Sequence, residues 1–164
     1  MRTIIRKIEV SEWQEWKKLR LAALQNSPES FGSTFEEESV CLDQKFEDDL
    51  KQNDVFGAFL EGQLVGCIGF WRWPSVKAKH EGTVWGMYVK PEFRRQKIAA
   101  ALIEAVIAHA KTLVIQLQLS CVTSNVGAIK LYEKYGFKSY AIESRSMKMN
   151  ETFYDEFRMI KKLD

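Results

Sequence analysis

The sequence lacks the features that mark membrane, secreted and nucleic-acid-binding proteins. No apolar run approaches the roughly 20 residues that a membrane-spanning helix needs. The N-terminal stretch MRTIIRKIEV is too short and too charged for a secretory signal. A net charge of +2 is too small to indicate nucleic-acid binding, which usually goes with a concentrated basic face. We therefore expect neither a membrane nor a nucleic acid as partner.

The sequence also lacks motifs for metals, disulfides and dinucleotides. Its three cysteines, Cys41, Cys67 and Cys121, are far apart, and no Cys-x-x-Cys pair is present. Cys67 and Cys121 fall in apolar strand patterns, which predicts core residues rather than nucleophiles. The absence of G-x-G-x-x-G argues against a dinucleotide-binding oxidoreductase. We expect no metal, and the odd cysteine count favours the reducing cytoplasm as location.

What is present is the composition of one globular domain. A chain of 164 residues is long enough to form a core without metals or disulfides. Its hydrophobic content of 46% and charged content of 28% are typical of soluble globular proteins. No repeat, low-complexity tract or linker interrupts the chain, so we predict a single domain over residues 1–164.

Hydrophobic periodicity predicts about seven strands and four helical segments. The predicted strands are Thr3–Val10, Asp54–Leu60, Leu64–Trp73, Val84–Val89, Leu113–Val122, Phe137–Lys148 and Thr152–Lys161. The predicted helices are Ser11–Asn26, a short amphipathic helix within Phe35–Gln52 that buries Leu42, Phe46 and Leu50, a long helix from Ile98, and Val126–Tyr135. This order predicts an α+β fold with a mixed sheet and helices on both faces. The central strand–helix–strand unit implies a parallel pair, with a ligand beyond the carboxyl ends of its strands.

The stretch WGMYVKPEFRRQKIAAAL, residues 85–102, has the layout of an anion site. A buried strand ends at Pro91, a cationic turn follows, and a helix begins at Ile98. The first turn of a helix has unpaired N–H groups and partial positive charge, and Arg94, Arg95 and Lys97 add full charges beside it. A solvated basic turn is the alternative, because surface charge runs are common.

A second stretch, Asn125–Phe137, reads N-x-x-A-x-x-L-Y-x-K-x-G-F. Together with YVKPEFRRQKIAAAL upstream, it resembles the GNAT superfamily of acetyl-CoA-dependent N-acyltransferases. The resemblance covers residues 81–162 closely, and the N-terminal half matches only in the order of its elements. It implies a splay between the two central parallel strands, and Gly86 marks a predicted bulge or close approach there.

The resemblance implies a set of site residues. The turn Arg94, Arg95, Gln96, Lys97, Ile98 and Ala99 is expected to hold the diphosphate of acetyl-CoA. Main-chain groups of Met87, Tyr88 and Val89 are expected to pair with the pantetheine arm like an added strand. Asn125 is expected to hydrogen-bond the arm, and Tyr132 is the expected general acid at the sulfur.

Two positions depart from the family pattern. Lys97 stands where the turn usually has glycine, which costs on the order of 1 kcal/mol if that position needs a positive φ. The usual carboxylate position in the central strand holds Thr83, so we predict Glu81 as the base that deprotonates the acceptor amine. His80 is the alternative base, and His109 is expected to be structural.

The predicted function is transfer of an acetyl group from acetyl-CoA to a primary amine of a small molecule, peptide or protein. The alternative is a CoA-binding module with little or no catalysis. Seven carboxylates between Glu36 and Asp49 form either a solvated helix face or an acidic rim that attracts a cationic acceptor. The expected partner is the amine acceptor, and the alternatives of a monomer and a homodimer stay open.

Overall fold

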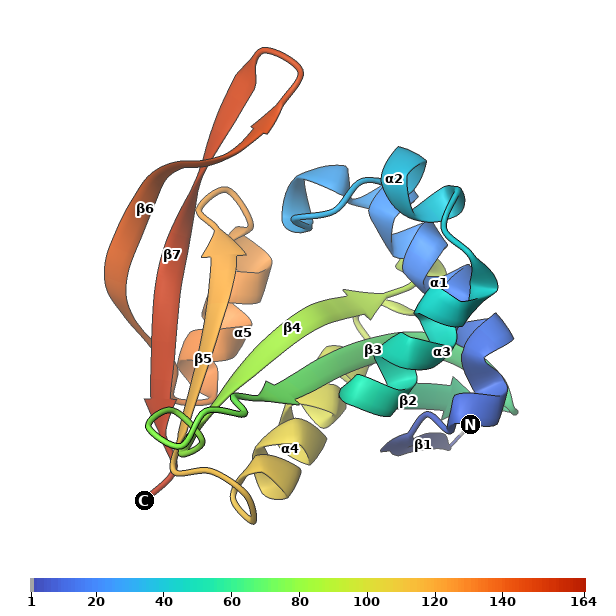
Figure 1. Cartoon of the computed structure of the whole chain (residues 1–164), viewed down its shortest axis with the longest axis horizontal. Helices are drawn as coiled ribbons and strands as arrows, with labels where there is room; N and C mark the ends of the chain where they lie inside the picture. The colour runs from blue at the N-terminus through green and yellow to red at the C-terminus, as the bar shows by residue number, and fades with distance from the viewer. Residues whose placement is uncertain (1) are drawn as a thin grey trace.

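The protein is built on one mixed sheet of seven strands, ordered β1-β2-β3-β4-β5-β7-β6, in a computed structural model that describes residues 2–164 (Figure 1). The strands are β1 (Thr3–Lys7), β2 (Asp54–Leu60), β3 (Gln63–Arg72), β4 (Glu81–Val89), β5 (Gln116–Val122), β6 (Lys138–Met149) and β7 (Thr152–Lys162). All neighbouring strands are antiparallel except β4 and β5, which run parallel at the centre. The predicted α+β class is confirmed.

Helices cover both faces of the sheet, as expected. They are α1 (Trp13–Asn26), α2 (Phe35–Ser39), α3 (Asp43–Gln52), α4 (Ile98–Ala110) and α5 (Val126–Lys134), with 3-10 turns η1 (Val10–Glu12), η2 (Pro28–Ser30) and η3 (Pro91–Phe93). Trp16 and Leu19 of α1 share a buried core with Phe46 of α3 and one side of β2 and β3. The helices α4 and α5 share the core on the opposite face. In Figure 1 the N-terminal helices lie over the β1–β4 half, which leaves β5–β7 as a separate wing.

Several element boundaries differ from the sequence prediction, and strand β4, for example, begins at Glu81 instead of Val84. The segment after Thr34 forms two helices, because α2 ends at Ser39 and the extended backbone of Leu42 (φ −62°, ψ 150°) is the N-cap of a new helix, α3. Leu42 is consequently 81% exposed instead of buried. Strand β5 begins at Gln116 instead of Leu113, because the N–H groups of Leu113 and Val114 still bond to the Ala110 carbonyl at the end of α4. Strand β1 ends at Lys7, since Val10 begins η1.

The central strands are paired at one end and separate at the other. The parallel register joins only Glu81 to Gln116, Gly82 to Leu117 and Thr83 to Gln118. Beyond Thr83, β4 keeps its partner β3 on one side, and no strand in the described part of the chain pairs with it on the side of β5. The edge of β4 therefore presents backbone donors and acceptors to the space between the strands, as a splayed pair should.

Gly86 makes the bulge that the sequence predicted. The register between β3 and β4 shifts here, because Tyr88 lies opposite Cys67 while Trp85 lies opposite Gly69. Gly86 has φ of 65°, a left-handed conformation that glycine adopts without steric strain and that other residues adopt at a cost in free energy. The Cys67 thiol lies 3.4 Å from the Gly86 carbonyl, which it contacts as a donor. The bulge turns β4 just before the residues expected to bind the pantetheine arm.

Away from the splay, Asp54 joins α4 to the first two strands. Its carboxylate is 2.8 Å from Nε2 of His109 and also pairs with Lys7. The His109 ring packs between Phe56 and Phe70, with ring centroids 5.3 and 5.5 Å away. Burial alone raises the pKa of the Asp54 carboxyl, but Lys7 and His109 outweigh it and lower that pKa overall.

This cluster makes stability depend on pH. Asp54→Asn is expected to lower the free energy of unfolding by about 1 kcal/mol at pH 7, because a charged hydrogen-bond partner is lost. The folded pKa lies below the unfolded one, so the stabilisation is present above about pH 3.9 and is lost as the pH falls through the folded value. Urea unfolding of wild type and variant at pH 7 and pH 3 measures the difference, which should shrink at pH 3. Asp164→Asn is the control, and a difference that does not change with pH would contradict the assignment.

Candidate active site

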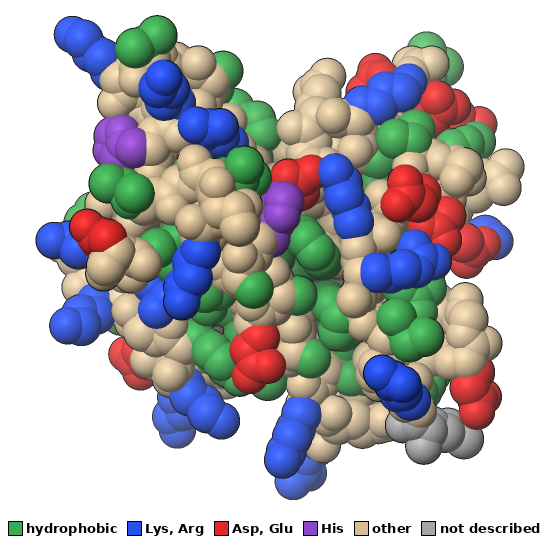
Figure 2. Space-filling view, turned by 90° about the horizontal axis from the view of Figure 1, so that it is seen from below, with side chains coloured by type: hydrophobic (Ala, Val, Ile, Leu, Met, Phe, Trp, Pro, Cys, Tyr) green, Lys and Arg blue, Asp and Glu red, His purple; other side chains and the backbone are tan. Residues whose placement is uncertain are grey.

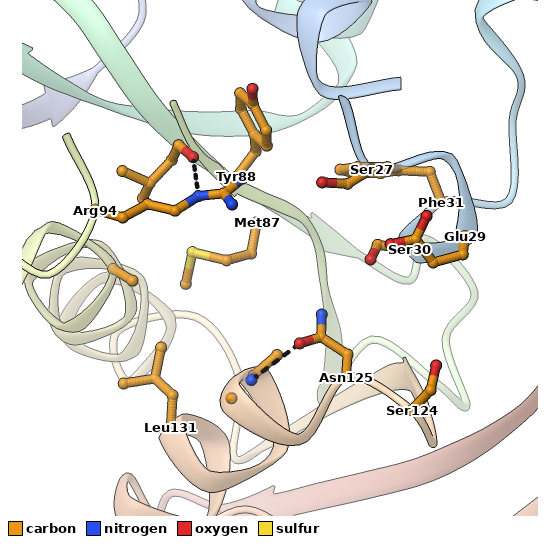
Figure 3. Close-up of a pocket in the computed structure, with 14 residues that line it drawn as sticks. Ser27, Glu29, Ser30, Phe31, Met87, Tyr88, Arg94, Ser124, Asn125 and Leu131 are labelled. Carbon is orange, nitrogen blue, oxygen red and sulfur yellow. Dashed lines mark hydrogen bonds between the residues drawn. The ribbon is translucent and has the colours of Figure 1, made fainter. Parts of the chain in front are cut away.

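The largest set of predicted site residues lines a cavity between β4 and α5. This β4–α5 cavity has a volume of about 450 Å³. It is lined by Met87, Tyr88, Val89, Arg94, Ala99 and Asn125 of the predicted set, and by residues of η2 and α5 (Figure 3). Six residues from two distant stretches of sequence therefore meet on one cavity, at the carboxyl ends of the central strands.

A smaller cavity of about 70 Å³, the splay cavity, lies between the separating strands. It shares Met87 and Asn125 with the β4–α5 cavity and adds Gly86, Cys121 and Tyr132. Tyr132 is 7% exposed, and its ring packs against Phe137 with centroids 5.8 Å apart. Its hydroxyl has no hydrogen-bond partner within residues 2–164, and it is therefore available to a ligand.

Burial keeps the acidic protons of this region in place. Desolvation, with a smaller effect from Cys121, raises the pKa of the Tyr132 phenol above its ordinary value. Burial also raises the pKa of the Cys121 thiol to about 11 and that of Cys67 to about 12. Tyr132 is therefore protonated at neutral pH, and both cysteines are thiols instead of nucleophilic thiolates.

A third cavity, of about 750 Å³, lies between the η2–α2 segment and the β6–β7 hairpin. This loop–hairpin cavity is lined by Leu24, Gln25, residues 28 and 29, residues 31–36, residues 146–150 and Tyr154. It shares Glu29 and Phe31 with the β4–α5 cavity, and Phe31 also lines the splay cavity. The short turn η2 is thus the wall at which all three spaces meet.

The cationic turn divides into residues that reach the cavity and residues that do not. Arg94 lines the β4–α5 cavity, where its Nε donates to the Val89 carbonyl at 2.9 Å. Arg95, Gln96 and Lys97 are exposed and form the turn before α4, and Ile98 is buried in the core. Lys97 is the N-cap of α4 with φ of 62° and makes no side-chain cap, so the first N–H groups of α4 stay unpaired.

Asn125 faces the cavity from the start of α5. Its Oδ1 accepts a hydrogen bond from the Ala128 N–H at 3.2 Å and caps the helix. Figure 3 shows its side-chain nitrogen directed into the cavity, opposite Met87. One side-chain amide thus fixes the helix with its oxygen and keeps a donor for a ligand.

The structure does not bring the two predicted bases to these cavities. Glu81 lies at the paired end of β4, where Gln116 and Gln118 donate to its carboxylate. It precedes Met87 by six strand positions, roughly 20 Å at the usual rise. His80 is exposed beside Arg72 and Lys111 at the same far end. A base role for Glu81 stays a prediction, and the paired register of β4 and β5 from Glu81 to Thr83 separates this residue from the splay.

The acidic run from Glu36 to Asp49 is largely neutralised by lysines. Asp43 pairs with Lys17, Asp49 with Lys45, and both Glu47 and Asp48 with Lys51. Figure 2, which views the molecule from below, shows acidic and basic side chains intermixed on its right-hand side. The pairing favours a solvated helix face over a field that attracts cations from a distance.

The wall made by Ser27, Glu29, Ser30 and Phe31 was missed by the sequence prediction of site residues. The sequence marks this segment only as an irregular loop with Pro, Gly and hydroxyl residues. A carboxylate and an aromatic side chain inside such a loop, directly after a helix, were the available signal. Among residues 2–164, no three His, Cys, Asp or Glu side chains are arranged to hold a metal, and no helix is long and apolar enough to cross a membrane.

A family model decides where this arrangement belongs. The model described as the acetyltransferase (GNAT) family matches residues 13–137, most of the chain. The chain belongs to the acetyltransferase (GNAT) family. This GNAT protein is accordingly an enzyme of the N-acetyltransferase class, and the predicted family, fold and activity class are confirmed.

Solved structures share the whole fold at low sequence identity. The acetyltransferase of the GNAT family from Streptococcus pneumoniae is 21% identical, with a TM-score of 0.87 over 99% of this chain and 100% of that one. The N-acetyltransferase from Staphylococcus aureus Mu50 is 19% identical, with a TM-score of 0.83 over all of both chains. The Salmonella typhimurium protein yncA, solved with its cofactor acetyl-CoA, is 14% identical, with a TM-score of 0.87 over 100% of this chain and 95% of that one. Among curated proteins, none matches the chain.

Proposed function

We propose that this GNAT protein transfers an acetyl group from acetyl-CoA, bound along β4 and the start of α4, to a primary amine that enters from the loop–hairpin cavity. The observation that carries the proposal is the free edge of β4, which lies beside a cavity that leads to the uncapped first turn of α4. An extended arm can pair with such an edge, and a diphosphate suits such a helix start. Family membership supports an enzyme over the alternative of a CoA-binding module.

Each residue of the set has a role in this proposal. Acetyl-CoA supplies an acetyl group activated as a thioester. Main-chain groups of residues 87–89 and the amide of Asn125 hold the arm, while Arg94 and the N–H groups of residues 97–99 face the diphosphate. The acceptor nitrogen, after loss of its ammonium proton to a base, attacks the thioester carbonyl and forms the C–N bond of a tetrahedral intermediate. The C–S bond then breaks, Tyr132 gives its proton to the departing sulfur, and the proton that the nitrogen loses as the amide forms restores the phenol.

Two measurements test the proposal. Acetyl-CoA should raise the melting temperature, since a ligand that binds only the folded state stabilises it by mass action. Dephospho-CoA and NAD should raise it less. Thiol release from acetyl-CoA in the presence of a panel of primary amines then reports transfer. The absence of a thermal shift at millimolar acetyl-CoA would overturn the proposal.

We also propose that the reaction takes place in the cytoplasm, since the cysteines at positions 41, 67 and 121 are free.

The strained turn before α4 gives a prediction on affinity. Lys97→Gly relieves a left-handed backbone but removes a charge near the diphosphate, so the two effects on the Kd of CoA oppose each other. We expect the Kd to change by less than about tenfold, or 1.4 kcal/mol, in isothermal titration. Arg145, which also has a positive φ (52°) but lies in β6, outside the predicted diphosphate turn, supplies the matched control Arg145→Gly. A hundredfold weaker Kd for Lys97→Gly alone would show that Lys97 contacts the phosphates directly.

A further inference from the structure

Among residues 2–164, Glu29 is the one carboxylate that lines the β4–α5 cavity. It lies in η2 and is half-buried, and it also lines the loop–hairpin cavity on the other side of the turn. No cation within residues 2–164 forms an ion pair with it. In Figure 3 its carboxylate lies beside Ser30 and Phe31, on the wall that faces Arg94 and Met87 across the cavity.

A half-buried carboxylate without a cation has lost part of its hydration, and no ion pair offsets the free-energy cost. An ammonium group can offset that cost through charge-assisted hydrogen bonds, which are stronger than neutral ones. The basic residue of this cavity, Arg94, lies on the wall of the α4 turn, where the proposed diphosphate would bind. Glu29 therefore marks the acceptor side of the cavity. The cavity has a cation, Arg94, on the side of the proposed diphosphate and an anion, Glu29, on the opposite side.

The space beyond Glu29 is lined by polar and apolar residues in similar numbers, and most of its large side chains are apolar. Six large side chains of the loop–hairpin cavity are aliphatic, thioether or aromatic: Leu24, Phe31, Phe35, Met147, Met149 and Tyr154. The charged groups that line it are Glu29, Glu36 and Lys148, and Lys148 lies 3.6 Å from Glu151. Its volume of about 750 Å³ is that of a site for a small molecule or a short peptide end. Methionine side chains adapt to apolar groups of different shape.

We propose that Glu29 binds the ammonium group of the acceptor and that the acceptor is a primary amine with an apolar body next to the nitrogen. The inference rests on the proposed function and adds to it a recognition residue and a substrate class. The amine meets Glu29 at the junction of the cavities, and its apolar body lies between the η2–α2 segment and the β6–β7 hairpin. From there, the deprotonated nitrogen reaches the splay cavity past Phe31.

The test compares a cationic acceptor with a neutral one. Phenylalanine amide carries an ammonium group on an aromatic body and is mostly protonated at pH 6.5. Hydroxylamine is a nucleophile whose nitrogen is uncharged near neutral pH. Glu29→Gln should raise the KM for phenylalanine amide roughly tenfold or more. It should change the enzymatic rate with hydroxylamine, corrected for the uncatalysed reaction, by less than about threefold. Glu61→Gln, in an exposed turn, is the matched control for the loss of a carboxylate.

The remaining outcomes overturn either this inference or the proposed function. An unchanged KM for phenylalanine amide, or an equal loss with both acceptors, would show that Glu29 does not recognise the ammonium. Transfer by the wild type to hydroxylamine without transfer to phenylalanine amide would overturn the substrate class and leave the proposed function in place. A wild type with no thermal shift in acetyl-CoA would instead overturn the proposed function. The same shift in Glu29→Gln shows that the variant is folded and binds cofactor.

Discussion

Tyr132→Phe is expected to lower kcat for acetyl transfer by roughly 10²-fold or more, with the affinity for acetyl-CoA and the stability nearly unchanged. Collapse of the tetrahedral intermediate leaves negative charge on sulfur, and a phenol in the splay cavity can protonate that sulfur. Burial raises the pKa of Tyr132, so the proton is present at neutral pH. The phenylalanine ring keeps the contact with Phe137 and removes only a hydroxyl that has no partner within residues 2–164.

Single-turnover and steady-state rates of thiol release, on an acceptor verified with the wild type, measure this effect. Tyr135→Phe is the matched control, because Tyr135 ends the same helix but donates its hydroxyl outward to Glu104 at 2.6 Å. It should retain kcat within about twofold, since surface changes away from a site usually have small effects. If Tyr132→Phe retains more than half of the wild-type kcat, the tyrosine is structural and the sulfur leaves with another acid or none.

Much of the lining of the β4–α5 cavity was predictable because it comes from local sequence. A strand, a cationic turn and a helix are contiguous between residues 85 and 102, and the start of α5 carries its own cap in Asn125. Hydrophobic periodicity and helix-capping residues act between neighbours in the sequence, so both stretches fold as their patterns indicate. The parallel crossover then brings them together at one end of the sheet.

The loop–hairpin cavity, the proposed acceptor site, was not predictable, because tertiary packing creates it. The turn η2 and the β6–β7 hairpin are more than 100 residues apart in sequence and form one cavity only in the folded chain. The base prediction shows the same limit. Glu81 is on the expected strand and near the expected position, but the strand rise places it roughly 20 Å from Met87. Likewise, the positive φ of Lys97 opposes the preference of its residue type, so only its resemblance to a glycine position pointed to it.

A buried ion pair, Arg20 of α1 with Glu38 of α2, lies next to Phe31 of the proposed acceptor wall. Their side chains form two hydrogen bonds, of 2.9 and 3.0 Å, and the residues are 9% and 4% exposed. Burial alone raises the pKa of Glu38, but the hydrogen bond and charge of Arg20, with Lys45, lower it overall. The Arg20 guanidinium also lies over Phe31, 5.3 Å from the ring centroid, and near Trp85.

This geometry predicts that Arg20→Met lowers the free energy of unfolding by about 3–5 kcal/mol, because it leaves the Glu38 carboxylate buried with only Lys45, 3.6 Å away, for charge. The melting temperature should fall by roughly 6–20 °C for a chain of this size. The double variant Arg20→Met, Glu38→Leu removes the orphaned charge and should recover much of that loss, because a buried pair replaced by apolar groups is often neutral.

Loss of the Arg20–Glu38 pair should also change the KM for the acceptor, since Arg20 contacts Phe31, the residue at which the three cavities meet. In the double variant, stability returns but Phe31 loses its cationic neighbour, so the KM for the acceptor should stay raised while the Kd of acetyl-CoA does not change. Urea unfolding gives the stabilities, and initial rates against acceptor concentration give the KM. If the single and double variants are equally unstable, the charge of Glu38 is not what Arg20 balances. If the double variant regains the wild-type KM as well, the pair holds α2 in place without positioning Phe31.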